Sequence, residues 1–283
     1  MASKYSQISA HSILLLGTLL IMVPIWIVFA SSTHDSITIA TKGMQFGLGD
    51  NFLNNYQNVL FERGGFSKEV TLLRLLSNSL VMAFGIATLT VITSLLAAYT
   101  IVYFKIKLAT TYFWLIFTTL LVPLEVRIFP SYAIVSELNL TNTYAGLILP
   151  LLASSIATFF FRQFYKTIPD ELLESAKLDG ASTWSFFIDF LVPLSKTMIA
   201  AMFIFMFVYG YSQYLWPLIM TTSEEYWTVI MGMKIIFTES YEGVAIPRTA
   251  ERFAYIILSM IPPVLVVVFL QKWFIKGLIQ TEK

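Results

Sequence analysis

The sequence predicts an all-α membrane protein with six transmembrane helices and a cytoplasmic helix between helices four and five. Of its 283 residues, 57% are hydrophobic and only 12% are charged, whereas soluble domains are about one quarter charged. The apolar residues gather in blocks of about 20, the length that a helix needs to cross the hydrocarbon core of a bilayer. These blocks are continuous and do not alternate with polar residues, which excludes a transmembrane β-barrel.

Six segments have this character, and we expect residues 1–283 to form a single transmembrane domain. The segments are residues 13–30, 75–104, 108–136, 144–161, 197–220 and 253–271. The first apolar run is longer than that of a cleavable signal sequence, so we expect it to be retained as a helix. Pro123 and Pro130 bracket the two charged residues of the third segment, which predicts a kink or local unwinding there.

Lysine and arginine residues near the helix ends indicate the orientation, because cytoplasmic loops are enriched in them. They lie between helices two and three, between helices four and five, and after helix six: Lys105, Lys107, Arg162, Lys166, Lys177, Lys196, Lys272, Lys276 and Lys283. Residues 31–71 mix both signs of charge and residues 221–251 lean acidic, so we place both segments outside. An even number of helices then puts both termini in the cytoplasm.

The composition also excludes several classes of function. The chain has 18 Lys plus Arg against 17 Asp plus Glu, so no basic excess indicates a nucleic-acid partner. It has no cysteine and only two histidines, His11 and His34, which predicts no metal site and no thiol chemistry. No phosphate-binding loop, serine-nucleophile turn or selectivity-filter string occurs, so we expect no cofactor and no catalytic residue. A passive channel or a membrane-embedded enzyme is the alternative from a different class.

The long polar stretch between helices four and five predicts a short helix over residues 169–178. Pro169 suits the first helical position, and Asp170 and Glu171 place negative charge where the helix dipole favours it. Leucine and alanine residues recur at helical spacing up to Ala176, and Gly180 suits a left-handed C-terminal cap. Periodicity alone favours a solvated connector with an amphipathic helix.

Residues 174–181, Glu-Ser-Ala-Lys-Leu-Asp-Gly-Ala, together with Leu191 and Pro193, resemble the Glu-Ala-Ala signature of bacterial ABC importer permeases. In that family this loop carries a coupling helix, which docks into a cleft on the ATP-hydrolysing subunit. The resemblance implies a role in coupling for Glu171, Glu174, Ala176, Asp179, Gly180 and Pro193. Ser175 stands where the family usually has alanine, and its small side chain still permits close docking.

Further motifs indicate the branch of the family. Residues 142–147, 161–164, 215–218 and 271–274 are similar to permeases of carbohydrate uptake. Residues 122–130, 159–164, 193–197 and 209–217 are similar to the second permease subunit of importers for sn-glycerol 3-phosphate. The resemblance implies glycerol 3-phosphate or a glycerophosphodiester as cargo, with a neutral sugar or oligosaccharide as the alternative.

The resemblance also implies the surroundings of the chain. We expect a multi-pass protein of the bacterial inner membrane, in contact with membrane lipid. Its expected partners are a homologous second permease, two ATP-binding subunits that hold ATP and magnesium, and an extracytoplasmic solute-binding protein. The outer segment at residues 221–251 is least similar to the family, so what it contacts stays open.

Four residues are candidates for the substrate pathway. Glu125 and Arg127 are ionisable groups at membrane depth, where such groups are costly and are usually functional. The Arg127 guanidinium could bind a phosphate through paired donors, or it could lie at the outer interface and pair with Glu125. Gln213 and Trp216 occur in the stretch of helix five that the resemblance places near the pathway, although aromatic stripes more often pack helices.

Overall fold

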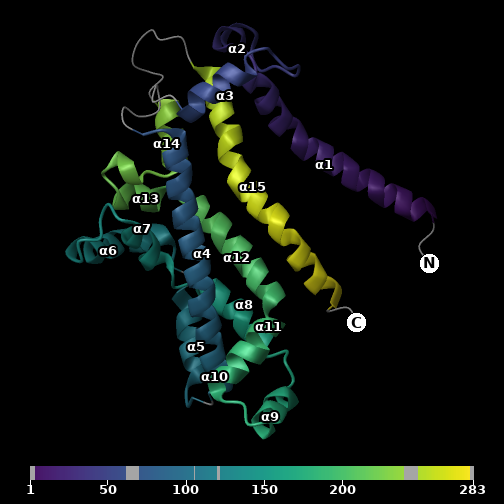
Figure 1. Ribbon diagram of the computed structural model, residues 1–283, viewed down its shortest axis with the longest axis vertical. Coiled ribbons are helices and arrows are strands. Elements are labelled where there is room, and N and C mark those ends of the chain that lie inside the picture. The colour runs from purple at the N-terminus through teal and green to yellow at the C-terminus, as the bar shows by residue number, and fades with distance from the viewer. Residues whose placement is uncertain (1–3, 62–69, 105, 120–121, 239–247, 281–283) are drawn as a thin grey trace. The chain divides into compact units, whose positions relative to one another are not determined.

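The computed structural model describes residues 4–61, 70–104, 106–119, 122–238 and 248–280 (Figure 1). All regular structure in these ranges is helical, which confirms the predicted all-α class. The longer helices are α1 (Lys4–Ser32), α3 (Phe52–Phe61), α4 (Leu72–Tyr103), α5 (Ala109–Thr118), α6 (Leu124–Glu137), α8 (Ser155–Tyr165), α9 (Asp170–Leu178), α12 (Lys196–Tyr211), α14 (Val229–Thr238) and α15 (Thr249–Gln280). The shorter ones are α2 (Ser36–Lys42), α7 (Tyr144–Ile148), α10 (Thr183–Ser185), α11 (Val192–Leu194) and α13 (Leu215–Met220). Lys105, Lys283 and residues 62–69 and 239–247 lie outside the described ranges, so the assignments made for them are not addressed.

Three of the six expected segments are each made of two helices and not of one. Residues 108–136 form α5 and α6, because Pro123 has an extended backbone and only serves as the N-cap of α6. Pro130 lies inside α6 and does not end it. Residues 197–220 form two helices, α12 and α13. The helix is interrupted because Pro217 has no N–H to donate to the carbonyl four residues earlier.

Residues 144–161 also break, into α7 with a following 3-10 turn and then α8. The hydroxyl of Ser154 accepts a hydrogen bond from the Ala157 N–H (3.2 Å) and starts α8 anew. The two parts differ in direction by 48°.

Three described helices are long and apolar enough to cross a membrane: Ser9–Ser32, Leu72–Tyr103 and Thr249–Lys272. Two bent pairs meet the same test together, which raises the number to five: Tyr144–Leu151 with Ser155–Tyr165, and Thr183–Leu194 with Lys196–Tyr211. The expected third segment is absent from this set, because its two halves are separate short helices.

The chain divides into two compact units, and α4, α14 and α15 contribute residues to both. The first unit consists of residues 1–76 and 232–261. In it, the Asn55 amide donates to the carbonyl oxygens of Ser32 (2.8 Å) and His34 (2.7 Å), and so satisfies groups that the end of α1 leaves free. Asp35 caps α2, and hydrogen bonds from the Thr38 hydroxyl and N–H lower the pKa of Asp35.

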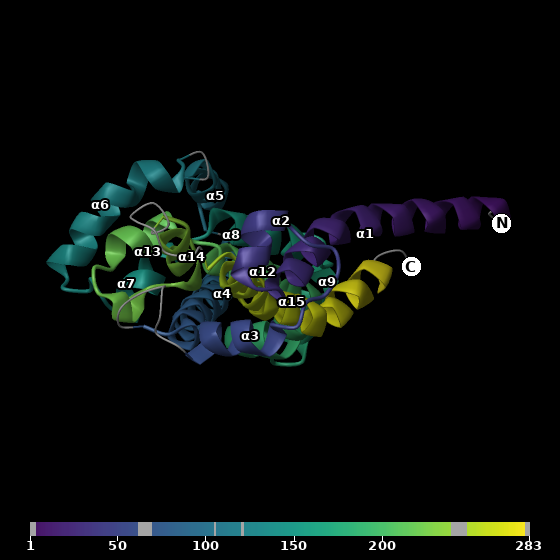
Figure 2. The same ribbon diagram turned by 90° about the horizontal axis from the view of Figure 1, so that it is seen from above.

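The second unit consists of residues 77–231 and 262–283. Within it, α8 packs against α5 and α12, and α13 packs against α6 and α7. Figure 1 shows α9 at the end of this unit away from α13, and Figure 2 shows α6 at its edge. Helix α12 approaches α4 closely, since a Cβ on Gly210 would lie 3.2 Å from the Ala83 Cα.

A buried amide ties this unit together. Asn78 on α4 is fully buried, and its amide donates to the carbonyl oxygens of Glu225 (2.7 Å) and Trp227 (2.9 Å). Its carbonyl oxygen accepts from the Tyr144 hydroxyl at 2.7 Å. One side chain therefore joins three separate segments of the unit.

We expect Asn78→Ala to lower the free energy of unfolding by about 3 kcal/mol, because it leaves several buried polar groups without partners. Tyr144→Phe removes only one of these bonds and should cost about half as much. Unfolding of the purified chain in mixed micelles, followed by circular dichroism during an SDS titration, measures both. Equal, near-zero effects would contradict the structural role of this amide.

Candidate functional site

The short helix that the sequence predicts over residues 169–178 is present as α9. Pro169 is the N-cap residue of this helix, one position before the first helical position that the sequence predicts for it. Asp170 and Glu171 lie in the first turn. Lys177 lies in its last turn, so charges at both ends oppose the helix dipole. The described helix, Asp170–Leu178, agrees with the predicted residues 169–178 to within one residue.

The C-terminus of α9 is closed by two hydrogen bonds around Gly180. The Gly180 N–H donates to the Lys177 carbonyl (3.1 Å), and the Ala181 N–H donates to the Ala176 carbonyl (2.9 Å). This is the Schellman arrangement, in which the residue that carries the first of these two donors has a left-handed backbone conformation. Gly180 has φ of +80°, which confirms the predicted cap. Its Cβ position is open, so only the backbone angle favours glycine here.

The two faces of α9 differ sharply. Ala176 is only 1% exposed and faces the rest of the unit, so it cannot touch a partner from its present position. Glu171, Glu174, Asp179 and Gly180 are exposed and present the predicted coupling residues to the outside. Leu178 is 88% exposed, which is costly for a leucine unless another surface covers it.

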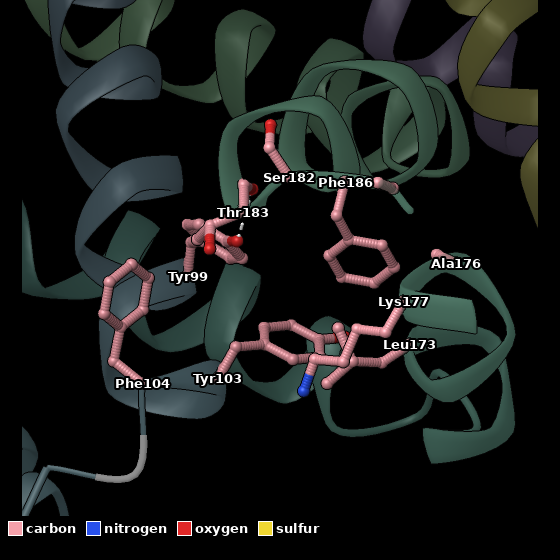
Figure 3. A pocket seen from close by; sticks show the side chains of 10 residues that line it. Tyr99, Tyr103, Phe104, Leu173, Ala176, Lys177, Ser182, Thr183 and Phe186 are labelled. Atoms are coloured by element: carbon pink, nitrogen blue, oxygen red, sulfur yellow. Dashed lines mark hydrogen bonds between the residues drawn. The ribbon is translucent and has the colours of Figure 1, made fainter. Parts of the chain in front are cut away.

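Behind α9 lies a cavity of about 410 Å³ (Figure 3). Aromatic side chains from the end of α4 form one wall, and Leu173, Ala176 and Lys177 of α9 form another. The Tyr99 hydroxyl donates to the Thr183 carbonyl at 2.7 Å, which ties α4 to the turn after α9. Helix α9 is thus packed against this unit along one face, and the chain that follows it is bonded to α4. The outer face of α9 makes no contact with the described part of this unit.

Sequence reasoning missed both Leu178 and this aromatic wall. Leu178 does not lie on the helix face formed by Leu172, Leu173 and Ala176. Its different position around the helix could have indicated that its side chain is exposed. The wall comes from α4, about seventy residues away in sequence, so local patterns could not predict it. Trp184 in the segment after α9 is exposed, whereas Phe186 and Phe187 nearby are buried.

Pro193, the last of the predicted coupling residues, marks a bend. It lies in α11 and is exposed, two residues before Ser195, where the chain turns by 74° into α12. A π-helical segment, Phe186–Leu191, precedes it. Proline cannot donate to the carbonyl four residues earlier, so a loosened helix at this place is expected.

Three of the four predicted pathway residues come together in a second cavity. Glu125, Arg127 and Gln213 line a space of about 340 Å³, together with Tyr209 and the first turn of α8. The Arg127 Nε is buried and has no hydrogen-bond partner. No ion pair between Glu125 and Arg127 is formed in the described part of the chain, so the suggested pairing of these two residues is not supported.

The ring of Trp216 lies elsewhere. It is fully buried in a core cluster, and its Nε1 donates to the Leu147 carbonyl at 3.1 Å. Trp216 does not line the cavity, which matches the packing alternative for this residue. Gln213 donates to the Tyr209 carbonyl (3.2 Å), which orients its amide at the break between α12 and α13.

Comparison with known proteins decides the family. Residues 90–280 match the family described as "binding-protein-dependent transport system inner membrane component". The chain belongs to this family. The permease is 43% identical to the sn-glycerol-3-phosphate transport system permease protein UgpE of Brucella melitensis, over 98% of both chains. It is likewise 43% identical to that of Rhizobium meliloti and 41% identical to that of Yersinia pestis.

A solved structure shares the fold of the permease. A bacterial ABC transporter involved in the import of the acidic polysaccharide alginate contains a chain that matches with a TM-score of 0.79 at 18% identity, covering 97% of this chain and 99% of that one. The relatives are transport permeases and not enzymes, in agreement with the sequence prediction. The permease is thus an inner-membrane component of an ABC importer.

Replacing Gly180 with valine should loosen the end of α9, because a left-handed conformation costs a β-branched residue about 1–2 kcal/mol. Hydrogen exchange at the Ala181 amide should then be faster by about 5–30-fold, measured by mass spectrometry of peptides covering residues 170–185. Gly180→Asn is the matched control and should show a smaller change, since asparagine tolerates this conformation. Equal exchange in both variants would contradict the cap.

Proposed function

We propose that this permease forms half of the translocation pathway of an importer for sn-glycerol 3-phosphate or a glycerophosphodiester. The similarity to glycerol-3-phosphate permeases over 98% of the chain carries this proposal. The second cavity supports it, since it is lined by the half-buried Arg127, whose buried Nε has no hydrogen-bond partner, and a guanidinium suits an anionic cargo.

In the proposed assembly, residues 1–283 act as one transmembrane domain with six crossings and with both termini in the cytoplasm. The third crossing is then made by α5 and α6 together. A homologous second permease completes the pathway, and a solute-binding protein delivers the cargo on the outer side. Two ATP-binding subunits hold ATP and magnesium, so this chain needs no cofactor of its own.

Helix α9 is the proposed coupling element. Its C-terminus is capped, acidic residues lie in its first turn, and its inner face is packed through Ala176, so it can move as one rigid piece. Its outer face offers Glu171, Glu174 and the exposed Leu178 to the ATP-binding subunit. Closure of the two ATP-binding subunits would push α9, and the chain from Gly180 through the bend near Pro193 would pass that motion to α12.

The second cavity is the proposed contact with the cargo. Arg127 would pair with the phosphate, and the first turn of α8 presents the positive end of a helix dipole to the same space. Gln213 and the Tyr209 hydroxyl could bind the glycerol hydroxyls. Glu125 would repel a phosphate, which keeps the site from holding an anion too tightly for release.

The coupling role predicts a defect when Leu178 becomes aspartate. Docking that buries this leucine is worth about 1.5–3 kcal/mol, so its loss should weaken contact with the ATP-binding subunit by about tenfold or more. In proteoliposomes containing the whole importer, uptake should fall, and the loaded binding protein should no longer stimulate ATP hydrolysis. Leu178→Met and Ser175→Ala are the controls and should keep both activities. Normal uptake by the aspartate variant would count against this docking surface.

The cavity predicts opposite effects for its two charged residues. Arg127→Gln should raise the apparent uptake constant for glycerol 3-phosphate by about tenfold or more, because it removes charge-assisted hydrogen bonds. Glu125→Gln should leave that constant unchanged or lower it. Uptake of radiolabelled cargo, with and without competing neutral sugars, measures both. Equal effects on phosphorylated and neutral cargo would contradict a phosphate contact and favour a structural role for Arg127.

A further inference from the structure

Arg162 on α8 carries a charge that the described protein does not neutralise. The residue is only 8% exposed, and its Nε is buried without a hydrogen-bond partner. No carboxylate among the described residues forms an ion pair with it. A buried cation without a partner is strongly unfavourable, so a counter-charge is expected.

Among the described residues, this guanidinium is in contact with an aromatic ring. The Arg162 Cζ lies 3.8 Å from the centroid of the Phe113 ring on α5. Phe113 in turn stacks on Phe117 and Phe159, so the ring is held in place. A cation–π contact is weaker than the cost of burying the charge. The described residues do not meet the rest of this cost, which indicates an anion from outside the described part of the chain.

The position of Arg162 indicates the kind of anion. Helices α5 and α8 lie antiparallel, because Ser155 at the start of α8 bonds to the Ile116 carbonyl near the end of α5 (2.8 Å). At the opposite end of this pair, Lys107 precedes α5 and Lys166 caps α8, and both are exposed. Trp114 on α5 is exposed as well. Basic and aromatic residues at helix ends are typical of a membrane interface.

We infer that Arg162, flanked by Lys107 and Lys166, binds the phosphate group of an anionic phospholipid between α5 and α8. A guanidinium binds phosphate through paired donors, and basic pockets between helices near the cytoplasmic surface are typical sites for anionic headgroups. The assignment to the cytoplasmic leaflet rests on the proposed orientation of the permease. The binding itself does not depend on the cargo or on coupling.

Native mass spectrometry of the purified full chain, released from micelles containing equal phosphatidylglycerol and phosphatidylcholine, tests this inference. The wild type should retain phosphatidylglycerol preferentially. Arg162→Gln should reduce that preference by about tenfold or more, and Arg162→Lys by less. Lys107→Gln and Lys166→Gln should each reduce it by about fivefold, and both positions are exposed, so folding should be preserved. Lys196→Gln is the control, an exposed lysine at the start of α12, and should leave the preference unchanged.

Two further measurements distinguish other sources of negative charge. Added inorganic phosphate should displace phosphatidylglycerol from the wild type, and the lipid should return when the phosphate is removed. Retention of inorganic phosphate without any preference for the anionic lipid would overturn the lipid assignment. A lipid preference that is unchanged in the three glutamine variants at positions 107, 162 and 166 would also overturn the lipid assignment. Loss of a co-purified second permease from Arg162→Gln, with lipid preference intact, would assign the counter-charge to a protein carboxylate and overturn the inference.

Discussion

The fold depends on one constraint: inside a bilayer, each backbone polar group must find its partner within the protein. Continuous helices meet this constraint by themselves, as α4 does over Leu72–Tyr103. The breaks meet it with side chains. The Ser154 hydroxyl caps α8, and the Asn78 amide satisfies two carbonyl oxygens. Non-helical backbone at membrane depth is expected only where it is buried in protein or lines a cavity, and the break before α6 borders the second cavity.

The proposed cargo site in the second cavity and the proposed coupling helix α9 are two separate places in one unit. The cavity beside α6 gathers charged and polar side chains where helices are interrupted. Helix α9 is the opposite case, since it is short and continuous, is capped at its C-terminus and packs through one small residue, Ala176. A rigid helix with an exposed apolar tip is suited to transmit force, whereas an interrupted helix is suited to bind and release.

Much of this could be predicted from the sequence, and the reasons are local. The apolar blocks predict the helical class, and the charges and Gly180 predict α9 with its cap, because these depend on residues close together in the chain. The prolines predict a disturbance in the third segment but not its extent, because Pro130 stays inside α6 while Pro123 precedes it. The aromatic wall behind α9, the burial of Trp216 and the isolation of Arg162 depend on contacts between distant segments. No local pattern contains that information.

In the proposed assembly, the outer face of α9 contacts an ATP-binding subunit. Because the chain has no cysteine, Leu178→Cys introduces a single thiol, and cross-linking to single cysteines on the partner can be read without background. In the purified complex we expect this thiol to cross-link to the ATP-binding subunit and to be protected from a water-soluble maleimide, with protection that changes when ATP binds. Equal maleimide labelling with and without the ATP-binding subunits, and no cross-link, would contradict the account.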